Sequence, residues 1–175
     1  ARAGYGPAVE YVDDYGRVLR REIRANRSSP DRQKQLGDDL YRGRNDLDKD
    51  AARAAYWYER AAERGHADAQ TMLAYLCYRG EGVEKDHERA FRWYREAAMQ
   101  DHPSSQASLG YLYGEGHGVE RDLKRAYAWS TLAAENGSDR GSRNQKIYLD
   151  AMANDARLDA LNEIRRLEKM IHGNK

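Results

Sequence analysis

The fold is decided by the stretch Asp86-His-Glu-Arg-Ala90-Phe-Arg-Trp93-Tyr94-Arg-Glu-Ala97-Ala98. A similar stretch precedes it by 36 residues and another follows it by 36 residues, so that Trp57, Trp93 and Trp129 share one period. A fixed period of about 20–50 residues is typical of solenoids, in which each repeat is one small supersecondary unit. The sequence therefore predicts a repeat protein.

Each copy of this stretch has the spacing of an amphipathic helix. Counting from the first alanine, the apolar residues stand at steps of three, four, seven and eight, which is one stripe of an α-helix. An aspartate precedes each stripe where an N-cap residue is expected, because its carboxylate accepts hydrogen bonds from free backbone N–H groups. These predicted N-caps are Asp50, Asp86 and Asp122.

A second helix precedes each stripe. In the central copy its pattern is Leu73-Ala74-x-x-Cys77-Tyr78-x-Gly80, and a glycine turn ending at Val83 follows. The third copy has the same turn at 116–119, whereas the first copy has one extra residue there. Glycine is the usual residue at helix C-termini, so each repeat is predicted to be helix, glycine turn, helix.

The chain resembles the Sel-one-like repeat (SLR) family, which is related to the tetratricopeptide repeat. The family pattern is a leucine–glycine pair, a Gly-x-Gly-Val turn, an aspartate and Ala-x-x-Trp-Tyr-x-x-Ala-Ala. Residues 105–137 meet it almost in full, and residues 69–101 and 32–65 meet it slightly less well. Leu40 and Cys77 replace the usual tyrosine, and Ser130 replaces the second aromatic residue.

The predicted fold class is all-α, and the resemblance implies a right-handed α/α superhelix of three helix-turn-helix repeats with helical caps. We expect one solenoid domain over residues 1–175. Its parts are an N-terminal capping helix (7–30), repeats at 31–66, 67–102 and 103–138, and C-terminal capping helices (139–172). In the last helix the predicted apolar stripe is Leu158, Leu161, Ile164, Leu167 and Ile171.

Composition sets further bounds. Charged residues make up 34% of the chain and mean hydropathy is −1.04, which suits a solenoid with a thin core. The net charge of +1 provides no overall field that would select nucleic acid, and no apolar run is long enough to span a membrane. We expect no nucleic-acid partner, no transmembrane segment, and a monomer or weak oligomer. The chain begins with Ala1, which fits a mature secreted or periplasmic bacterial protein or a trimmed chain.

Nothing in the sequence indicates catalysis, a metal or a cofactor. The histidines at 66, 87, 102, 117 and 172 form no His-x-x-x-His pair. No strand precedes the glycine turns and no Lys-Ser/Thr pair follows them, so they are not phosphate loops. Cys77 lies on the helix face that carries Leu40 and Tyr113 in the other copies, and we expect a buried apolar group.

Tyr75 and Tyr111 are the main candidates for a binding surface. Each stands two residues after the leucine of its repeat, off the stripe between helices, and Asp38 is the first-repeat equivalent. The resemblance implies that the first helix of each repeat lines the concave face. A partner-binding face of Asp38, Tyr75, Tyr78 and Tyr111 is therefore predicted; the alternative is that the tyrosines pack between repeats.

A basic stretch on the N-terminal helix is a second candidate. It consists of Arg17, Arg20, Arg21, Arg24 and Arg27, opposed only by Glu22. It is either a solvated helix face or a docking patch for an acidic partner or an anionic lipid.

The predicted function is a non-catalytic scaffold or adaptor that binds a partner protein on its concave face. The resemblance implies this, because SLR proteins act as adaptors. Two alternatives stay open: an immunity partner of a secreted toxin, and a protein that binds envelope glycan or peptidoglycan along a tyrosine-lined groove.

Overall fold

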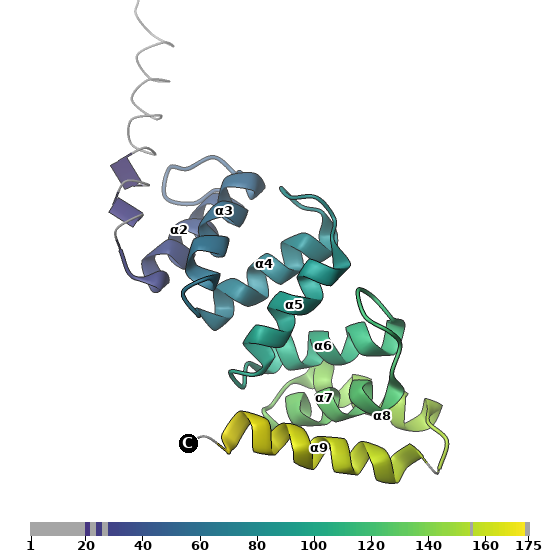
Figure 1. Ribbon diagram of the computed structural model, residues 1–175. Helices are drawn as coiled ribbons and strands as arrows, with labels where there is room; N and C mark the ends of the chain where they lie inside the picture. Colours follow the sequence, from purple (N-terminus) through teal and green to yellow (C-terminus); the bar gives the residue numbers. More distant parts are fainter. Residues whose placement is uncertain (1–19, 22–23, 26–27, 155, 174–175) are drawn as a thin grey trace, which may run out of the picture.

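The computed structural model describes residues 20–21, 24–25, 28–154 and 156–173. Residues 28–154 and 156–173 form eight α-helices and no strand (Figure 1). The predicted all-α solenoid is confirmed. The helices are α2 (Pro30–Arg42), α3 (Ala51–Ala62), α4 (Ala67–Arg79), α5 (His87–Ala98), α6 (Pro103–Glu115), α7 (Leu123–Glu135), α8 (Asp139–Ala151) and α9 (Ala156–His172).

The helices stack in chain order. Helix pairs α2–α3, α4–α5 and α6–α7 pack within the repeats, and α3–α4, α5–α6 and α7–α8 join each repeat to the next element. The last helix departs from this order, because α9 turns back and packs along α7 (Figure 1). Residues 20–21 and 24–25 of the predicted N-terminal helix are helical, and the rest of that prediction lies outside the described residues.

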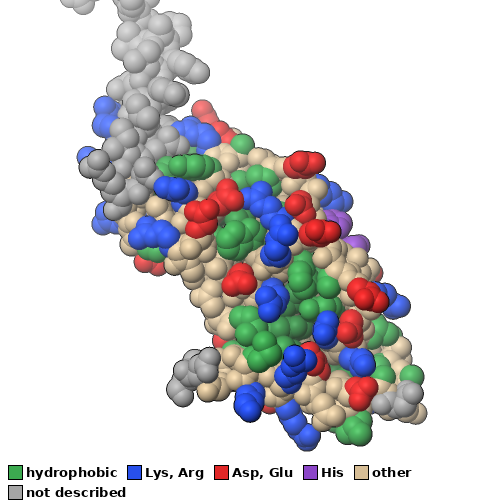
Figure 2. All heavy atoms as spheres, in the orientation of Figure 1, with side chains coloured by type: hydrophobic (Ala, Val, Ile, Leu, Met, Phe, Trp, Pro, Cys, Tyr) green, Lys and Arg blue, Asp and Glu red, His purple; other side chains and the backbone are tan. Residues whose placement is uncertain are grey.

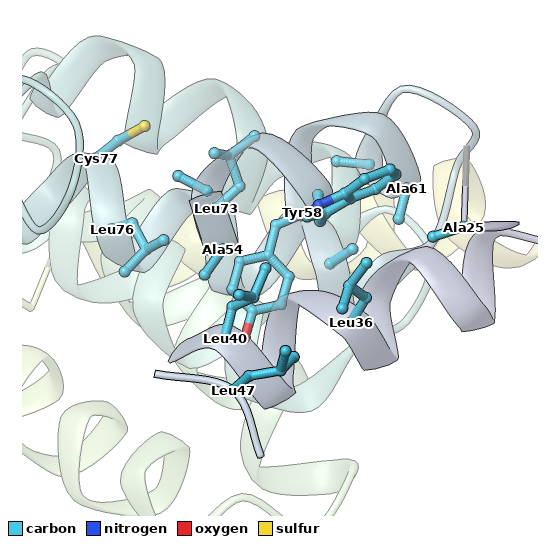
Figure 3. Packing of buried hydrophobic residues seen from close by; sticks show 14 of the residues in the cluster. Ala25, Leu36, Leu40, Leu47, Ala54, Tyr58, Ala61, Leu73, Leu76 and Cys77 are labelled. Carbon is cyan, nitrogen blue, oxygen red and sulfur yellow. The ribbon is translucent and has the colours of Figure 1, made fainter. Parts of the chain in front are cut away.

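The leucine–glycine pair of the first repeat shows why the small residue is needed. The ring of Tyr58 on α3 packs against α2 beside Leu36 and Leu40 (Figure 3). A β-carbon added to Gly37 would lie 2.7 Å from an atom of the Tyr58 ring. Glycine at this position therefore lets the two helices close over a fully buried aromatic residue.

The three tryptophans are not equally buried, although the repeat pattern predicts equivalent places. Trp57 and Trp129 are each 3% exposed, whereas Trp93 is only partly buried. Trp129 shares its cluster with Leu167 of α9, which lies along α7. The central helix α5 packs mainly against α4 and α6, whereas α9 packs mainly along α7, and Trp93 keeps more of its surface in solvent.

The predicted aspartate caps are confirmed. Asp50, Asp86 and Asp122 each accept a hydrogen bond from the backbone N–H three residues later. The structure adds a second set of caps, in which His66 begins α4 and His102 begins α6. In both, ring Nδ1 lies 3.3 Å from the backbone nitrogen that it caps. These two histidines therefore have a structural role in the turns between repeats.

The last helix corrects one prediction. Leu158 and Leu161 are 65% and 45% exposed, so their assignment to the buried stripe was wrong. The buried stripe begins at Ala160 instead, and it continues through Ile164, Leu167 and Ile171. The reason is that α9 packs mainly on α7, so that only one narrow face of the helix is covered.

Candidate partner-binding pocket

The structure brings three of the four predicted partner-binding residues into one pocket. The pocket has a volume of about 230 Å³ and lies among α4, α5, α6 and the beginning of α8. Its walls combine tyrosine rings, hydroxyl groups and two guanidinium groups. The lining residues are Tyr75, Tyr78, Arg79, Tyr94, Ser108, Tyr111, Leu112 and Arg140.

Tyr75 and Tyr111 occupy equivalent positions on α4 and α6, and both are half-buried. The rings of Tyr78 and Tyr111 meet edge to face, with their centroids 6.3 Å apart. Tyr75 and Tyr111 also pack against the buried cluster of Ala74 and Leu112. Each of these two tyrosines therefore packs between repeats and also lines the pocket. The two alternatives, a binding surface and packing between repeats, are thus compatible.

Asp38 lies apart from this pocket. Its carboxylate accepts hydrogen bonds from the hydroxyl of Tyr58 at 2.8 Å and from Nζ of Lys34 at 2.9 Å. Burial and the hydrogen bond to Asp38 both raise the pKa of Tyr58, so that its hydroxyl stays protonated. Asp38 thus holds α2 and α3 together within the first repeat.

An aromatic cluster adjoins the pocket, and sequence reasoning missed it. Tyr78 stacks on His87 with ring centroids 4.9 Å apart, and its hydroxyl lies 3.2 Å from Nδ1 of His117. The rings of His87 and His117 are also 4.9 Å apart. The three residues come from α4, from the beginning of α5 and from the turn after α6, so no sequence spacing would have grouped them.

The hydroxyl groups of Tyr78 and Tyr94 are neutral at physiological pH. Burial raises the pKa of Tyr78 to about 12, and burial does the same for Tyr94. At the rim, Glu81 accepts a hydrogen bond from the hydroxyl of Tyr41 at 2.9 Å and lies 3.3 Å from Nε of Arg79. These contacts lower the pKa of Glu81, the hydrogen bond from Tyr41 most of all.

The N-terminal basic stretch is described only in part. Arg20 and Arg24 are exposed, and Arg21 donates a hydrogen bond to the carbonyl of Asn45. Arg17 and Arg27 lie outside the described residues. A shallow cavity of about 220 Å³ lies here and is lined in part by Arg21 and Arg24.

Charge is mixed over the molecule. Figure 2 shows acidic and basic side chains interspersed over the visible face, around a hydrophobic area near the middle of the view. Cys77 is buried as expected, and burial raises the pKa of its thiol. Among the described residues no group of three His, Cys, Asp or Glu side chains could hold a metal ion. None of the described helices has the length and apolar character needed to cross a membrane.

The chain is similar to known solenoid proteins. It is 27% identical to c5321, a protective antigen present in uropathogenic Escherichia coli strains that displays an SLR fold, with a TM-score of 0.80 over 90% of this chain. The match covers 33% of c5321, so the chain spans about a third of the length of that protein. A Sel1 repeat protein from Oxalobacter formigenes is 29% identical, with a TM-score of 0.65, over 74% of this chain and 96% of that one.

Family membership follows from the repeats themselves. No curated protein matches this chain in sequence. The Sel1 repeat matches residues 33–66, 67–102 and 103–138, which together make up more than half of the chain. The resemblance that the tryptophan period and the glycine turns indicate is thereby confirmed: the chain belongs to the Sel1 repeat family.

Proposed function

We propose that this protein is a non-catalytic adaptor and that a partner protein binds at the pocket between α4, α6 and α8. Sel1 repeat proteins generally are non-catalytic scaffolds that mediate protein–protein interaction. The finer proposal is the location, on the face formed by the first helices of the repeats, which we take to be the concave face.

The pocket itself carries this proposal. Four tyrosines line it, among them Tyr75 and Tyr111 at equivalent positions of two neighbouring repeats. Tyrosine supplies a large amphipathic contact area at low cost in side-chain entropy, and for this reason it is common at interface hot spots. Because packing already holds these rings in place, less of their freedom is lost when a partner binds.

The test is affinity capture from cell extract with the wild-type protein and two variants. The first variant carries Tyr75→Ala and Tyr111→Ala, and the matched control carries Tyr56→Ala. Tyr56 lies on α3, is 50% exposed and does not line the pocket, so the control removes an accessible tyrosine elsewhere. Thermal unfolding of all three proteins by circular dichroism shows whether they fold.

We expect one protein to be retained by the wild type and by Tyr56→Ala and to be lost with the pocket variant. If all three proteins retain the same set, the pocket is not the binding surface. If the pocket variant unfolds, the two tyrosines are core residues and the proposed location is wrong. If the wild-type protein retains cell-wall fragments and no protein, the result favours the glycan-binding alternative.

A further inference from the structure

Arg140 is a charged group that has no counter-ion among the described residues. It lies in the first turn of α8, and its side chain is on the wall of the pocket. Nη1 donates a hydrogen bond to the hydroxyl of Ser108 at 3.1 Å, and the guanidinium carbon lies 5.4 Å from the ring centroid of Tyr111. Within the described part of the chain Arg140 forms no ion pair, and no Asp or Glu lines the pocket.

The other cation of the pocket differs in this respect. Arg79 lies at the rim, where Nε is 3.3 Å from Oε1 of Glu81. Its charge is therefore balanced by a carboxylate of the same turn. Arg140 instead contacts the hydroxyl of Ser108 and the face of the Tyr111 ring, and neither of these groups carries a negative charge that would neutralise it. Among the residues that line the pocket, Arg140 is thus the cation that no carboxylate balances.

We propose that the pocket receives an acidic side chain, Asp or Glu, of the partner protein, and that Arg140 pairs with its carboxylate. This inference rests on the proposed function and names the chemistry of its partner. Arginine pairs with carboxylates through two parallel N–H···O bonds, and such charged hydrogen bonds are stronger than neutral ones. The contact with Tyr111 already orients the guanidinium group, which lowers the entropy cost of pairing.

The residues that line the pocket also limit which residue can stand next to the acidic one in the bound segment. The wall of the pocket also includes the rings of Tyr75, Tyr78 and Tyr111 and the buried side chain of Leu112. An apolar or aromatic residue adjacent to the acidic one would contact these rings. We therefore expect the bound segment to combine one acidic residue with one apolar neighbour.

A library of random peptides displayed on phage tests this chemistry. It is selected on the full wild-type chain, and the enriched peptides are synthesised with their acidic residue intact and as the amide (Glu→Gln or Asp→Asn). Affinities are measured by fluorescence anisotropy against the wild type, Arg140→Gln, and the control Arg143→Gln. Arg143 is an exposed residue one turn further along α8 and does not line the pocket, so both variants lose the same charge.

We expect an acidic residue at a common position of the enriched peptides. Arg140→Gln should weaken binding about tenfold or more, and Arg143→Gln should change it little. Changing the acidic residue of the peptide to its amide should lower its affinity for the wild type by a similar factor. The same change should lower its affinity for Arg140→Gln little further, because both changes remove the same ion pair. Thermal unfolding of Arg140→Gln and of the charge-keeping variant Arg140→Lys shows that the fold is intact.

The outcomes separate this inference from the proposed function. If the peptides lose affinity with Tyr75→Ala/Tyr111→Ala but bind Arg140→Gln and Arg143→Gln equally, the pocket binds peptides and the carboxylate inference fails. Enriched peptides that lack an acidic residue overturn it in the same way. Peptides that bind the Tyr75→Ala/Tyr111→Ala variant and Arg140→Gln as tightly as the wild type would contradict the proposed binding site and the carboxylate inference together. The absence of any enriched peptide would do the same.

Discussion

Gly118 lies directly against the backbone of His87. A β-carbon added to Gly118 would stand 2.2 Å from the carbonyl oxygen of His87, and one added to Gly82 would stand 2.3 Å from the carbonyl carbon of Ala51. The second glycine of each turn therefore lets the turn touch the beginning of the second helix of the preceding repeat. The turn of the first repeat differs, because Asn45 and Asp46 hold its left-handed positions.

This contact predicts that Gly118→Ala is strongly destabilising. Gly118 has φ of 72°, and the added methyl group would also meet the backbone of α5. Left-handed strain and overpacking together should cost about 2–5 kcal/mol of unfolding free energy, measured by denaturant titration. The control is Gly137→Ala, where φ is 82° and nothing lies within 4 Å, so that strain alone should cost about 1–2 kcal/mol. Equal losses in the two variants would show that close packing is not the reason for Gly118.

The tryptophans should differ in their contribution to stability. Trp129→Ala removes a 3% exposed ring that is packed under α9, and we expect a loss of about 3–5 kcal/mol. Trp93→Ala should cost less, about 1–2 kcal/mol, because this ring already contacts solvent. Denaturant unfolding followed by circular dichroism measures both. A loss at Trp93 as large as that at Trp129 would contradict the burial order that the fold indicates.

Asp101 predicts an acid-dependent contact between the second repeat and α9. Oδ2 lies 2.9 Å from Nε2 of His172, and Oδ1 accepts hydrogen bonds from Asn136 and Gln106. The hydrogen bond from His172 is the main reason that the pKa of Asp101 is lower than its ordinary value near 3.8. The unfolded chain therefore takes up this proton at higher pH than the folded chain. The stabilisation is complete well above pH 3.8 and is lost as the pH falls below it.

The variant Asp101→Asn keeps the size of the side chain and tolerates the left-handed backbone at this position, where φ is 67°. At neutral pH we expect it to lose about 1 kcal/mol of unfolding free energy. The difference from the wild type should shrink when unfolding is measured below pH 3.8, because the wild-type carboxyl is then protonated as well. Asp150→Asn, at an exposed aspartate of α8, is the control and should change neither value. A difference that is the same at every pH would refute the ionic part of this contact.

Repeat spacing predicts the helices, the aspartate caps and the tyrosine positions, because each of these depends on contacts that recur in every copy. The repeat period places Tyr75 and Tyr111 at equivalent positions, and the resemblance to the SLR family implies the face that they share. Arg140 could not be placed in this way, because it comes from α8, after the three repeats, and its approach to Tyr111 depends on how α8 packs on α6.

The remaining differences have the same origin. Leu158 and Leu161 fit a helical stripe as well as the buried residues do, and only the docking of α9 on α7 decides which stripe is covered. Asp38 occupies the position of Tyr75, but Tyr58 of the next helix engages its carboxylate. Helical periodicity specifies a face of a helix; which neighbour meets that face depends on tertiary packing.

His87 predicts a second pH dependence, of opposite chemical origin. Nε2 of His87 is buried without a hydrogen-bond partner in the described structure, and Tyr78 stacks on the ring. Burial lowers the pKa of His87 from its ordinary value of 6.5, and the nearby His117 and Lys85 lower it further, against an opposing effect of Asp86. The unfolded chain thus binds a proton that the folded chain does not bind as readily, so stability falls as the pH drops through about 6.5.

His87→Phe keeps a ring against Tyr78 and removes the titrating group. We expect its unfolding free energy at pH 7.5 to lie within about 1 kcal/mol of the wild type and to decline less between pH 7.5 and 5.5 in urea titrations. Arg143→Gln, at an exposed residue of α8, is the control and should follow the wild-type pH profile. Parallel pH profiles for the wild type and His87→Phe would mean that His87 is protonated as readily in the folded chain as in the unfolded one.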